Sequence, residues 1–258
     1  MKPGNFSKFV TVATLIFFYL PIIVVVVFSF NSSKSPEWTG FSTKWYVQLF
    51  TSTRYLHVWR TFFNSIIVGT TASLTAVLIG TFGAIAMYLG SPRFKKLMWT
   101  TTYIPFVIPD IIIGVSLLIF FVTIRLQLSL FTVYVAHVTF SIPYTMMIIL
   151  TRLQDFDKTI IEAAYDLGAT KSIVLMKVIV PIAMPGIIAA FFMAFTLSID
   201  DFVITFFVAG PNATTLPLQI FSMIRFGISP VINAISSLLL LGTIFISFLL
   251  RRYVRYII

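Results

Sequence analysis

Three aspartates lie inside long hydrophobic stretches of the sequence. Asp110 directly follows Pro109, and Asp200 and Asp201 are adjacent residues. An aspartate at the centre of a membrane-spanning helix costs about 2.5–3.5 kcal/mol even by the lower estimates, so each one needs a reason. Proline removes a backbone donor and leaves carbonyl oxygens free, and free carbonyls beside a carboxylate suit a cation. We therefore expect these three aspartates to lie along a cation pathway.

Two threonines extend the polar stripe around the aspartate pair. Thr196 precedes Asp200 by one helical turn, and Thr205 follows Asp201 by one turn. Adjacent helix positions differ by about 100°, so we expect both carboxylates to reach one wall of a cavity, together with Thr196. The alternative, which stays open, is that these acids cap helices or pair with basic groups of a partner subunit.

The hydrophobic stretch from 130 to 150 also carries polar side chains, among them His137, Ser141 and Tyr144. Tyr144 follows Pro143 at another expected helix break, and we count Tyr144 among the pathway residues. His137 and Ser141 are more typical of satisfied packing residues. The sequence has no cysteine and only two histidines, 80 positions apart, so we expect no metal site.

A long polar interruption runs from Arg152 to Pro185 between two hydrophobic stretches. Its pattern predicts a helix that ends at Gly168, then a second amphipathic helix that Pro181 stops. A helical hairpin of this kind, placed between two membrane spans, predicts a docking surface for a soluble partner.

The elements that must position these residues are membrane spans. Hydrophobic residues make up 59% of the 258 residues and charged residues only 10%, and the mean hydropathy is +1.01, which indicates an all-α polytopic membrane protein. The retained N-terminal span is too long for a signal peptide. The six predicted transmembrane helices are Phe9–Phe30, Phe62–Leu89, Leu97–Thr123, Leu130–Leu150, Ile182–Val208 and Ile232–Leu250.

The basic residues set the predicted orientation. The net charge of +10 does not indicate nucleic acid here, because Lys and Arg gather in short loops, as orientation in a bilayer requires. Twelve of the 18 Lys and Arg residues lie in the two termini, the loop around Arg93 and the loop 152–181. The positive-inside rule therefore predicts both termini and loop 152–181 in the cytoplasm of a multi-pass protein.

Two short helices are expected on the opposite side. Residues 42–50 begin with N-cap residues and predict an interfacial helix in a loop rich in Trp and Tyr. Leu216–Arg225 predicts a re-entrant or surface helix. The aromatic residues are typical of a belt at the lipid headgroups. A docking face for an external partner is the alternative.

Residues 162–181 resemble the EAA signature of ABC importer permeases. Glu162, Ala163 and Ala164 precede Gly168, and Pro181 ends the motif after a spacer. Two residues depart mildly from the family pattern: Ile179 lies one place after the usual isoleucine, and Val180 replaces leucine. The resemblance implies a type I ABC importer permease fold, with a cytoplasmic coupling helix between the fourth and fifth spans. The implied coupling residues are Glu162, Ala163, Ala164, Asp166, Gly168 and Pro181.

Nearly the whole chain is similar to polyamine permeases, of the type of the second permease of the spermidine/putrescine importer. The similar segments are residues 31–33, 38–42, 45–46, 109–111, 137–140, 195–201 and 216–218, with Ile220, Ser222 and Met223. The resemblance implies residues 1–61 as a first helix with its extracytoplasmic loop, 62–250 as the importer core and 251–258 as a basic cytoplasmic tail. The implied location is the inner membrane of a bacterium.

The same resemblance implies a set of partners. These are a second homologous permease, a dimeric cytoplasmic ATP-binding subunit and an extracytoplasmic polyamine-binding protein, with the lipid bilayer around the spans. The sequence has no P-loop and no set of catalytic residues, so ATP and magnesium are expected on the partner ATPase subunits, and no cofactor on this chain.

Three rival functions remain open from the sequence. A permease of the same family for another solute, such as ferric ion or a small organic cation, would have the same motifs. An ion-driven secondary transporter or channel would use the three acids as a relay, but the predicted docking hairpin and the lack of an inverted repeat count against it. A membrane enzyme is the weakest alternative.

Overall fold

The computed structural model describes residues 5–34, 37–225 and 230–254. Its regular elements are all helices, beside one isolated bridge between Asn31 and Phe41, so the predicted all-α class is confirmed. The chain forms two compact units, Met1–Trp59 with Ile220–Ile258 (unit 1) and Arg60–Gln219 (unit 2). The domain boundaries predicted from the sequence, after residues 61 and 250, differ from this division into units. Those domains stay a prediction.

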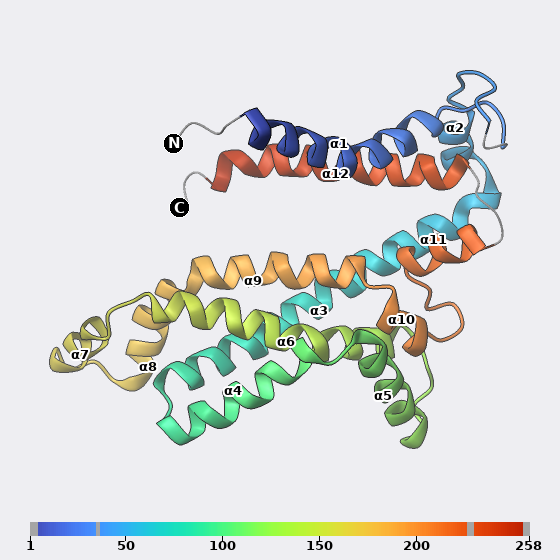
Figure 1. The fold of residues 1–258 in the computed structure, drawn as a ribbon. Helices are drawn as coiled ribbons and strands as arrows, with labels where there is room; N and C mark the ends of the chain where they lie inside the picture. Colours follow the sequence, from blue (N-terminus) through green and yellow to red (C-terminus); the bar gives the residue numbers. More distant parts are fainter. Residues whose placement is uncertain (1–4, 35–36, 226–229, 255–258) are drawn as a thin grey trace. The chain divides into compact units, whose positions relative to one another are not determined.

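Unit 1 is built on two long helices that lie side by side. Helix α1 (Asn5–Phe28) packs along α12 (Pro230–Val254), and the two run in opposite directions (Figure 1). The short helix α2 (Lys44–Thr51) also contacts α12 and is followed by the 3-10 turn η1 (Thr53–Tyr55). The helix predicted at 42–50 is thus confirmed.

The loop before α2 folds around one buried asparagine. The side chain of Asn31 is fully buried, and its Oδ1 accepts hydrogen bonds from the backbone N–H of Thr39 at 3.0 Å and from its hydroxyl at 3.1 Å. The indole N–H of Trp45 donates to the carbonyl oxygen of Asn31 at 2.7 Å. These bonds satisfy polar groups that burial would otherwise penalise, so they fix the loop against α2.

Unit 2 is built around α6 (Leu130–Gln154), which packs along α9 (Val180–Asp200) and also contacts α4, α5 and α10. The helical hairpin formed by α7 and α8 lies at one end of this unit, and α5 and α10 lie at the other (Figure 1). The remaining elements are α3 (Leu56–Leu89), α4 (Pro92–Val107), α5 (Asp110–Thr123), α7 (Thr159–Asp166), α8 (Lys171–Val174), η2 (Leu175–Ile179), α10 (Val203–Val208) and α11 (Leu216–Arg225).

Two of the predicted spans are broken. The span predicted at Leu97–Thr123 is two helices, α4 and α5, bent by 105° at Ile108 and Pro109. The residue before a proline is pushed out of the helical region, and Ile108 accordingly has ψ 128°. The span predicted at Ile182–Val208 is also wrong as one helix, because α9 ends at Asp200 and α10 begins at Val203.

Pro181 does not stop a helix, which corrects the sequence-based prediction. One helical path runs from Lys171 to Asp200 through α8, η2 and α9. The turn before the proline is a π-helix, in which the N–H of Val180 bonds to the carbonyl of Leu175. A proline ring clashes with the carbonyl four residues earlier in a regular helix, and a wider π turn relieves that clash.

Four helical segments of the described chain are long and apolar enough to cross a membrane, and the bent pair of α4 and α5 makes a possible fifth. The four are Phe6–Phe28, Thr53–Leu89, Leu130–Gln154 and Lys171–Asp200. The apolar segment of α12, Pro230–Phe245, is shorter than these four. The total of six spans stays a prediction.

Gly80 allows α3 and α6 to approach closely. A Cβ atom at Gly80 would lie 2.2 Å from Oγ1 of Thr145. That hydroxyl itself bonds to the carbonyl of Ala76 at 3.0 Å. We expect Gly80→Ala to destabilise the protein by about 1–3 kcal/mol through overpacking, measured as a lower thermal unfolding midpoint in detergent. Gly242→Ala is the matched control, since a Cβ there meets nothing within 4 Å; equal midpoints for the two variants would contradict this packing.

Candidate functional site

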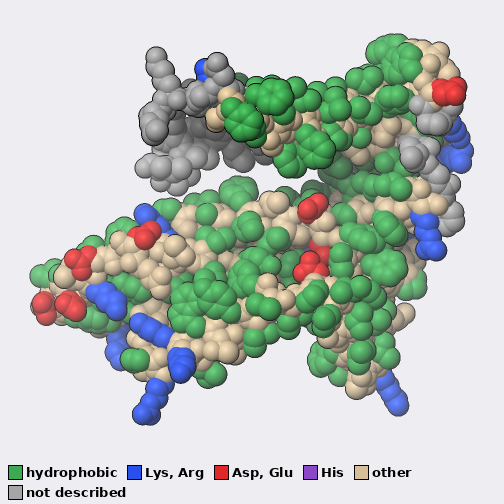
Figure 2. All heavy atoms as spheres, viewed as in Figure 1, with side chains coloured by type: hydrophobic (Ala, Val, Ile, Leu, Met, Phe, Trp, Pro, Cys, Tyr) green, Lys and Arg blue, Asp and Glu red, His purple; other side chains and the backbone are tan. Residues whose placement is uncertain are grey.

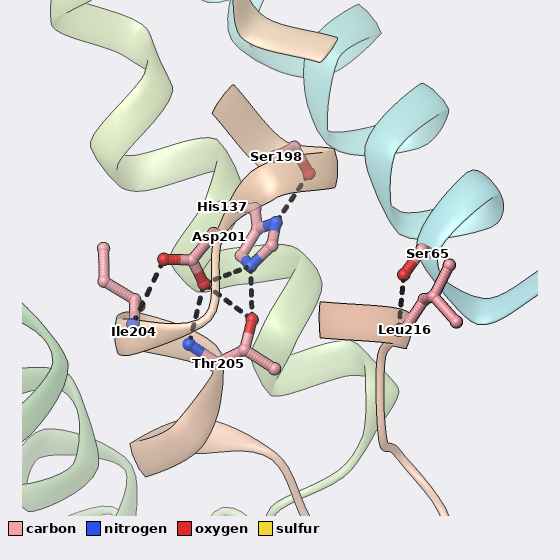
Figure 3. A network of polar contacts seen from close by, with 7 residues as sticks. All are labelled: Ser65, His137, Ser198, Asp201, Ile204, Thr205 and Leu216. Atoms are coloured by element: carbon pink, nitrogen blue, oxygen red, sulfur yellow. Dashed lines mark hydrogen bonds and ion pairs between the residues drawn. The ribbon is translucent and has the colours of Figure 1, made fainter. Parts of the chain in front are cut away.

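A buried polar network joins α6 to the break between α9 and α10 (Figure 3). Nε2 of His137 lies 3.2 Å from Oδ2 of Asp201 and 2.9 Å from Oγ1 of Thr205. Its Nδ1 lies 2.6 Å from Oγ of Ser198. The His137 side chain is fully buried, and that of Asp201 is 8% exposed. All polar atoms of the imidazole thus have partners.

The hydroxyl of Thr205 determines which atoms donate hydrogen bonds in this network. Its hydroxyl donates to Oδ2 of Asp201 at 2.7 Å, which uses its single proton. The contact between Thr205 and His137 therefore requires a proton on Nε2 of the imidazole. The same N–H points at the Asp201 carboxylate, so His137 is a donor to both residues.

Asp201 also satisfies the start of α10. Its carboxylate accepts the backbone N–H of Ile204 at 3.2 Å and that of Thr205 at 2.8 Å. The first N–H groups of a helix have no partner within the helix, so a carboxylate there is stabilising. This capping contact was the open alternative for the aspartates, and the geometry favours it for Asp201.

Asp200 points elsewhere. It is exposed, whereas its neighbour Asp201 is turned toward α6, so the expectation that both carboxylates reach one wall is wrong. Thr196 is exposed one turn earlier on α9, and its hydroxyl bonds to the carbonyl of Phe192 at 2.8 Å. Thr196 and Asp200 thus share one open face of α9.

Asp110 is the first residue of α5, directly after the 105° bend, and is exposed. Its carboxylate is close enough to the Tyr144 hydroxyl for the two to interact electrostatically. The Tyr144 ring packs against Phe106 with centroids 4.5 Å apart. The structure therefore brings two predicted pathway residues, Asp110 and Tyr144, into one neighbourhood with an aromatic pair.

The two breaks are also close to each other. Helix α10 packs against α5, and a Cβ at Gly114 would lie 3.3 Å from Cα of Ile204. Gly114 follows Asp110 by one turn, and Ile204 is held by Asp201. Figure 2 shows acidic side chains within the largely hydrophobic surface of this unit, away from the charged end at α7. Exposed carboxylates at these breaks are those of Asp110 and Asp200.

Part of this arrangement was not predicted from the sequence. His137 and Ser141 were expected to be packing residues, and Ser198 was not singled out. Both α6 residues are fully buried, yet Oγ of Ser141 has no hydrogen-bond partner within the described chain. The spacing of Ser198, Asp201 and Thr205, at three and four residues, would have been the available signal for one polar face, although it does not name His137 as the partner.

The predicted coupling residues lie in the hairpin at the other end of unit 2. Glu162, Ala163, Ala164 and Asp166 are in α7, none of whose residues is buried. Apolar side chains are open there as well, with Ile160 and Tyr165 each 43% exposed and Leu167 89% exposed. Pro181, by contrast, follows the π turn and lies within the long helix.

Two features shape the ends of α7. The backbone N–H of Thr159 donates to Asp157 at 3.0 Å, and this bond lowers the pKa of that carboxyl below its ordinary value. A cavity of about 220 Å³ lies beside α7, and Glu162, Lys95 and Lys158 are among the residues that line it. The surface of the hairpin is thus charged as well as apolar.

Within the described residues, no group of three or more His, Asp or Glu side chains is arranged to hold a metal ion. The site is a set of carboxylates, hydroxyls and aromatic rings at two helix breaks. Carboxylates and aromatic rings are groups that attract cations.

Comparisons with known proteins agree with this fold. The chain is 38% identical over 225 residues to the spermidine/putrescine transport system permease protein PotC of Escherichia coli (strain K12), covering 87% of this chain and 84% of PotC. It is 39% identical over 236 residues to the putrescine transport system permease protein PotI of the same strain, covering 87% and 82%.

A crystal structure of a bacterial ABC transporter involved in the import of the acidic polysaccharide alginate contains a chain of the same fold. The TM-score is 0.73 at 16% identity, over 94% of this chain and 92% of that one. Residues 76–257 match the model of the family described as binding-protein-dependent transport system inner membrane component. This chain therefore belongs to the family of binding-protein-dependent transport system inner membrane components.

Proposed function

We propose that this chain is a permease subunit of an ATP-driven importer that carries polyamines such as spermidine and putrescine across the inner membrane of a bacterium. The observation that carries the proposal is the pair of exposed carboxylates, Asp110 and Asp200, in an otherwise apolar surface at two helix breaks. Support comes from relatives at 38% and 39% identity whose names include spermidine and putrescine.

The chemistry of the site suits a linear polycation. A protonated amine about 4 Å from a carboxylate gains roughly 4 kcal/mol at the effective dielectric constant of about 20 near a protein surface. The rings of Tyr144 and Phe106 offer cation–π contact beside Asp110. Separate, moderate attractions let a substrate enter and leave, whereas one tight site would trap it.

The energy of ATP hydrolysis in a partner subunit would reach this site along one continuous helical path. The helical path from Lys171 to Asp200 is continuous over 30 residues, about 45 Å at 1.5 Å per residue. It begins next to the hairpin of α7 and ends at the Asp200 carboxylate. A displacement of α7 by a partner would therefore reach Asp200 through the turn at Gly168 and this one helical path.

The proposed partner at α7 is a dimeric cytoplasmic ATPase, which binds ATP and magnesium. The exposed apolar side chains of Ile160, Tyr165 and Leu167 supply surface for it. The distribution of Lys and Arg supports a cytoplasmic position for this hairpin and both termini. A second permease would complete the walls of the pathway, and an extracytoplasmic binding protein would deliver the polyamine.

The test is uptake by the assembled importer. The chain is reconstituted in vesicles with an ATPase, a second permease and a binding protein of the same organism, and uptake of labelled spermidine and putrescine is measured with and without ATP. We expect ATP-dependent uptake of at least one polyamine. Uptake of ferric ion or another organic cation alone would favour the rival substrate, and uptake by the isolated chain without ATP would contradict the importer mechanism.

A further inference from the structure

We propose that His137 is a positioning residue for transport: it holds the break between α9 and α10 in its bent form, so that Asp200 faces the substrate. This inference rests on the proposed function and assigns a role to a side chain that is not itself on the pathway. His137 is fully buried, so it does not touch a substrate.

The contacts of His137 span the break from a third helix. Ser198 lies in the last turn of α9, Asp201 lies in the break, and Thr205 lies in α10. The imidazole reaches all three from α6, at 2.6, 3.2 and 2.9 Å. Figure 3 shows the side chains of Ser198, Asp201 and Thr205 around the His137 ring.

The position of Asp200 depends on this arrangement. Its two flanking anchors are Ser198, two residues before it, and Asp201, the next residue. Both are held by the same imidazole, so the backbone at Asp200 is fixed on both sides. The carboxylate of Asp201 is thereby kept inward, and that of Asp200 is left exposed on the face of Thr196.

A purely structural role for a buried histidine predicts something different. Loss of a packing residue would lower the amount and the thermal stability of the protein. Loss of a positioning residue lowers the transport rate of each assembled complex. The coupling hairpin should not respond, because it begins beyond Gln154, about 25 Å along α6 from His137.

The experiment compares His137→Leu with His137→Gln in the reconstituted importer, normalised to assembled complex. Leucine makes no hydrogen bond, whereas the glutamine amide can still donate to Asp201. We expect His137→Leu to lower maximal polyamine uptake about tenfold to hundredfold, the range for losing a hydrogen bond to a charged group. His137→Gln should recover most of it. Half-saturation and copurification with the ATPase should be unchanged in both.

A double variant tests whether His137 acts through Asp201. If it does, His137→Leu added to Asp201→Asn lowers uptake little beyond Asp201→Asn alone. Additive losses, wild-type uptake by His137→Leu, or equal losses in the Leu and Gln variants would overturn the inference. A wild-type complex that takes up neither spermidine nor putrescine would instead overturn the proposed function, and the inference with it.

Discussion

Replacing Asp200 with asparagine is expected to lower polyamine uptake at least about tenfold while the importer still assembles. Asparagine keeps the size of the side chain and loses its charge. A cation about 4 Å from a carboxylate gains roughly 4 kcal/mol at an effective dielectric constant of about 20. Loss of about a third of that attraction already corresponds to a factor of ten. The measurement is uptake of labelled spermidine by vesicles that contain the complete complex.

Asp110→Asn should act in the same direction, since its carboxylate is exposed after the bend between α4 and α5. Asp155→Asn is the charge control, because Asp155 is exposed at the end of α6, outside the two breaks. Copurification of the ATPase is measured alongside it, because Asp155 lies in the predicted docking loop. Unchanged uptake in both the Asp110 and the Asp200 variant would contradict the cation pathway. If uptake fell as much in the Asp155 variant, the effect would come from the loss of a negative charge anywhere in the chain and not from the two breaks.

Asp201→Asn has a different expected consequence. Its carboxylate accepts bonds from Ile204, Thr205 and His137, so the change weakens the start of α10 as well as the charge. Part of its effect should therefore be a lower thermal unfolding midpoint. Asp200 makes no such contacts within the described part of the chain, so Asp200→Asn is the cleaner test of attraction.

The class and most helices of this chain could be predicted from sequence because long apolar runs have few alternatives in a bilayer. The continuity of the spans could not. Pro109 and Pro181 are both prolines after apolar residues, yet the first lies at a 105° bend and the second lies inside a continuous helix. The difference is a local π turn before Pro181, which depends on backbone geometry and not on residue type.

The candidate site could also be predicted only in part from the sequence. The sequence indicated that Asp200 and Asp201 need a reason to lie in an apolar stretch, and for Asp201 the structure supplies one in its contacts with His137 and the start of α10. Which of the two carboxylates is buried depended on the break after α9, which ends the helical 100° relation between neighbours. His137 was the missing partner, because a contact across 64 residues has no local signal.

The second large effect is expected at Gly168, where the chain turns between α7 and α8. Gly168 has φ +82°, in the left-handed region that glycine adopts without strain. Its N–H bonds to the carbonyl of Tyr165 at 2.8 Å, and the N–H of Ala169 bonds to that of Ala164 at 3.1 Å. This pair of bonds is the Schellman motif, which ends α7 and sets the direction of the chain into α8.

Gly168→Pro should therefore uncouple the importer. The proline ring fixes φ at about −65° and removes the N–H that bonds to Tyr165. We expect the loaded binding protein to lose its stimulation of ATPase activity, or the ATPase to dissociate, while the membrane helices remain folded. The measurements are stimulated ATPase activity and copurification of the ATPase with this chain.

A graded series separates backbone conformation from a simple loss of space. No atom lies within 4 Å of a Cβ at Gly168, so side-chain size is not the obstacle. Asparagine enters the left-handed region more easily than alanine does, and alanine pays about 1–2 kcal/mol there. Coupling should accordingly fall in the order glycine, asparagine, alanine, proline. A Gly168→Pro complex with wild-type stimulation and uptake would show that the turn after α7 does not transmit the motion of the ATPase.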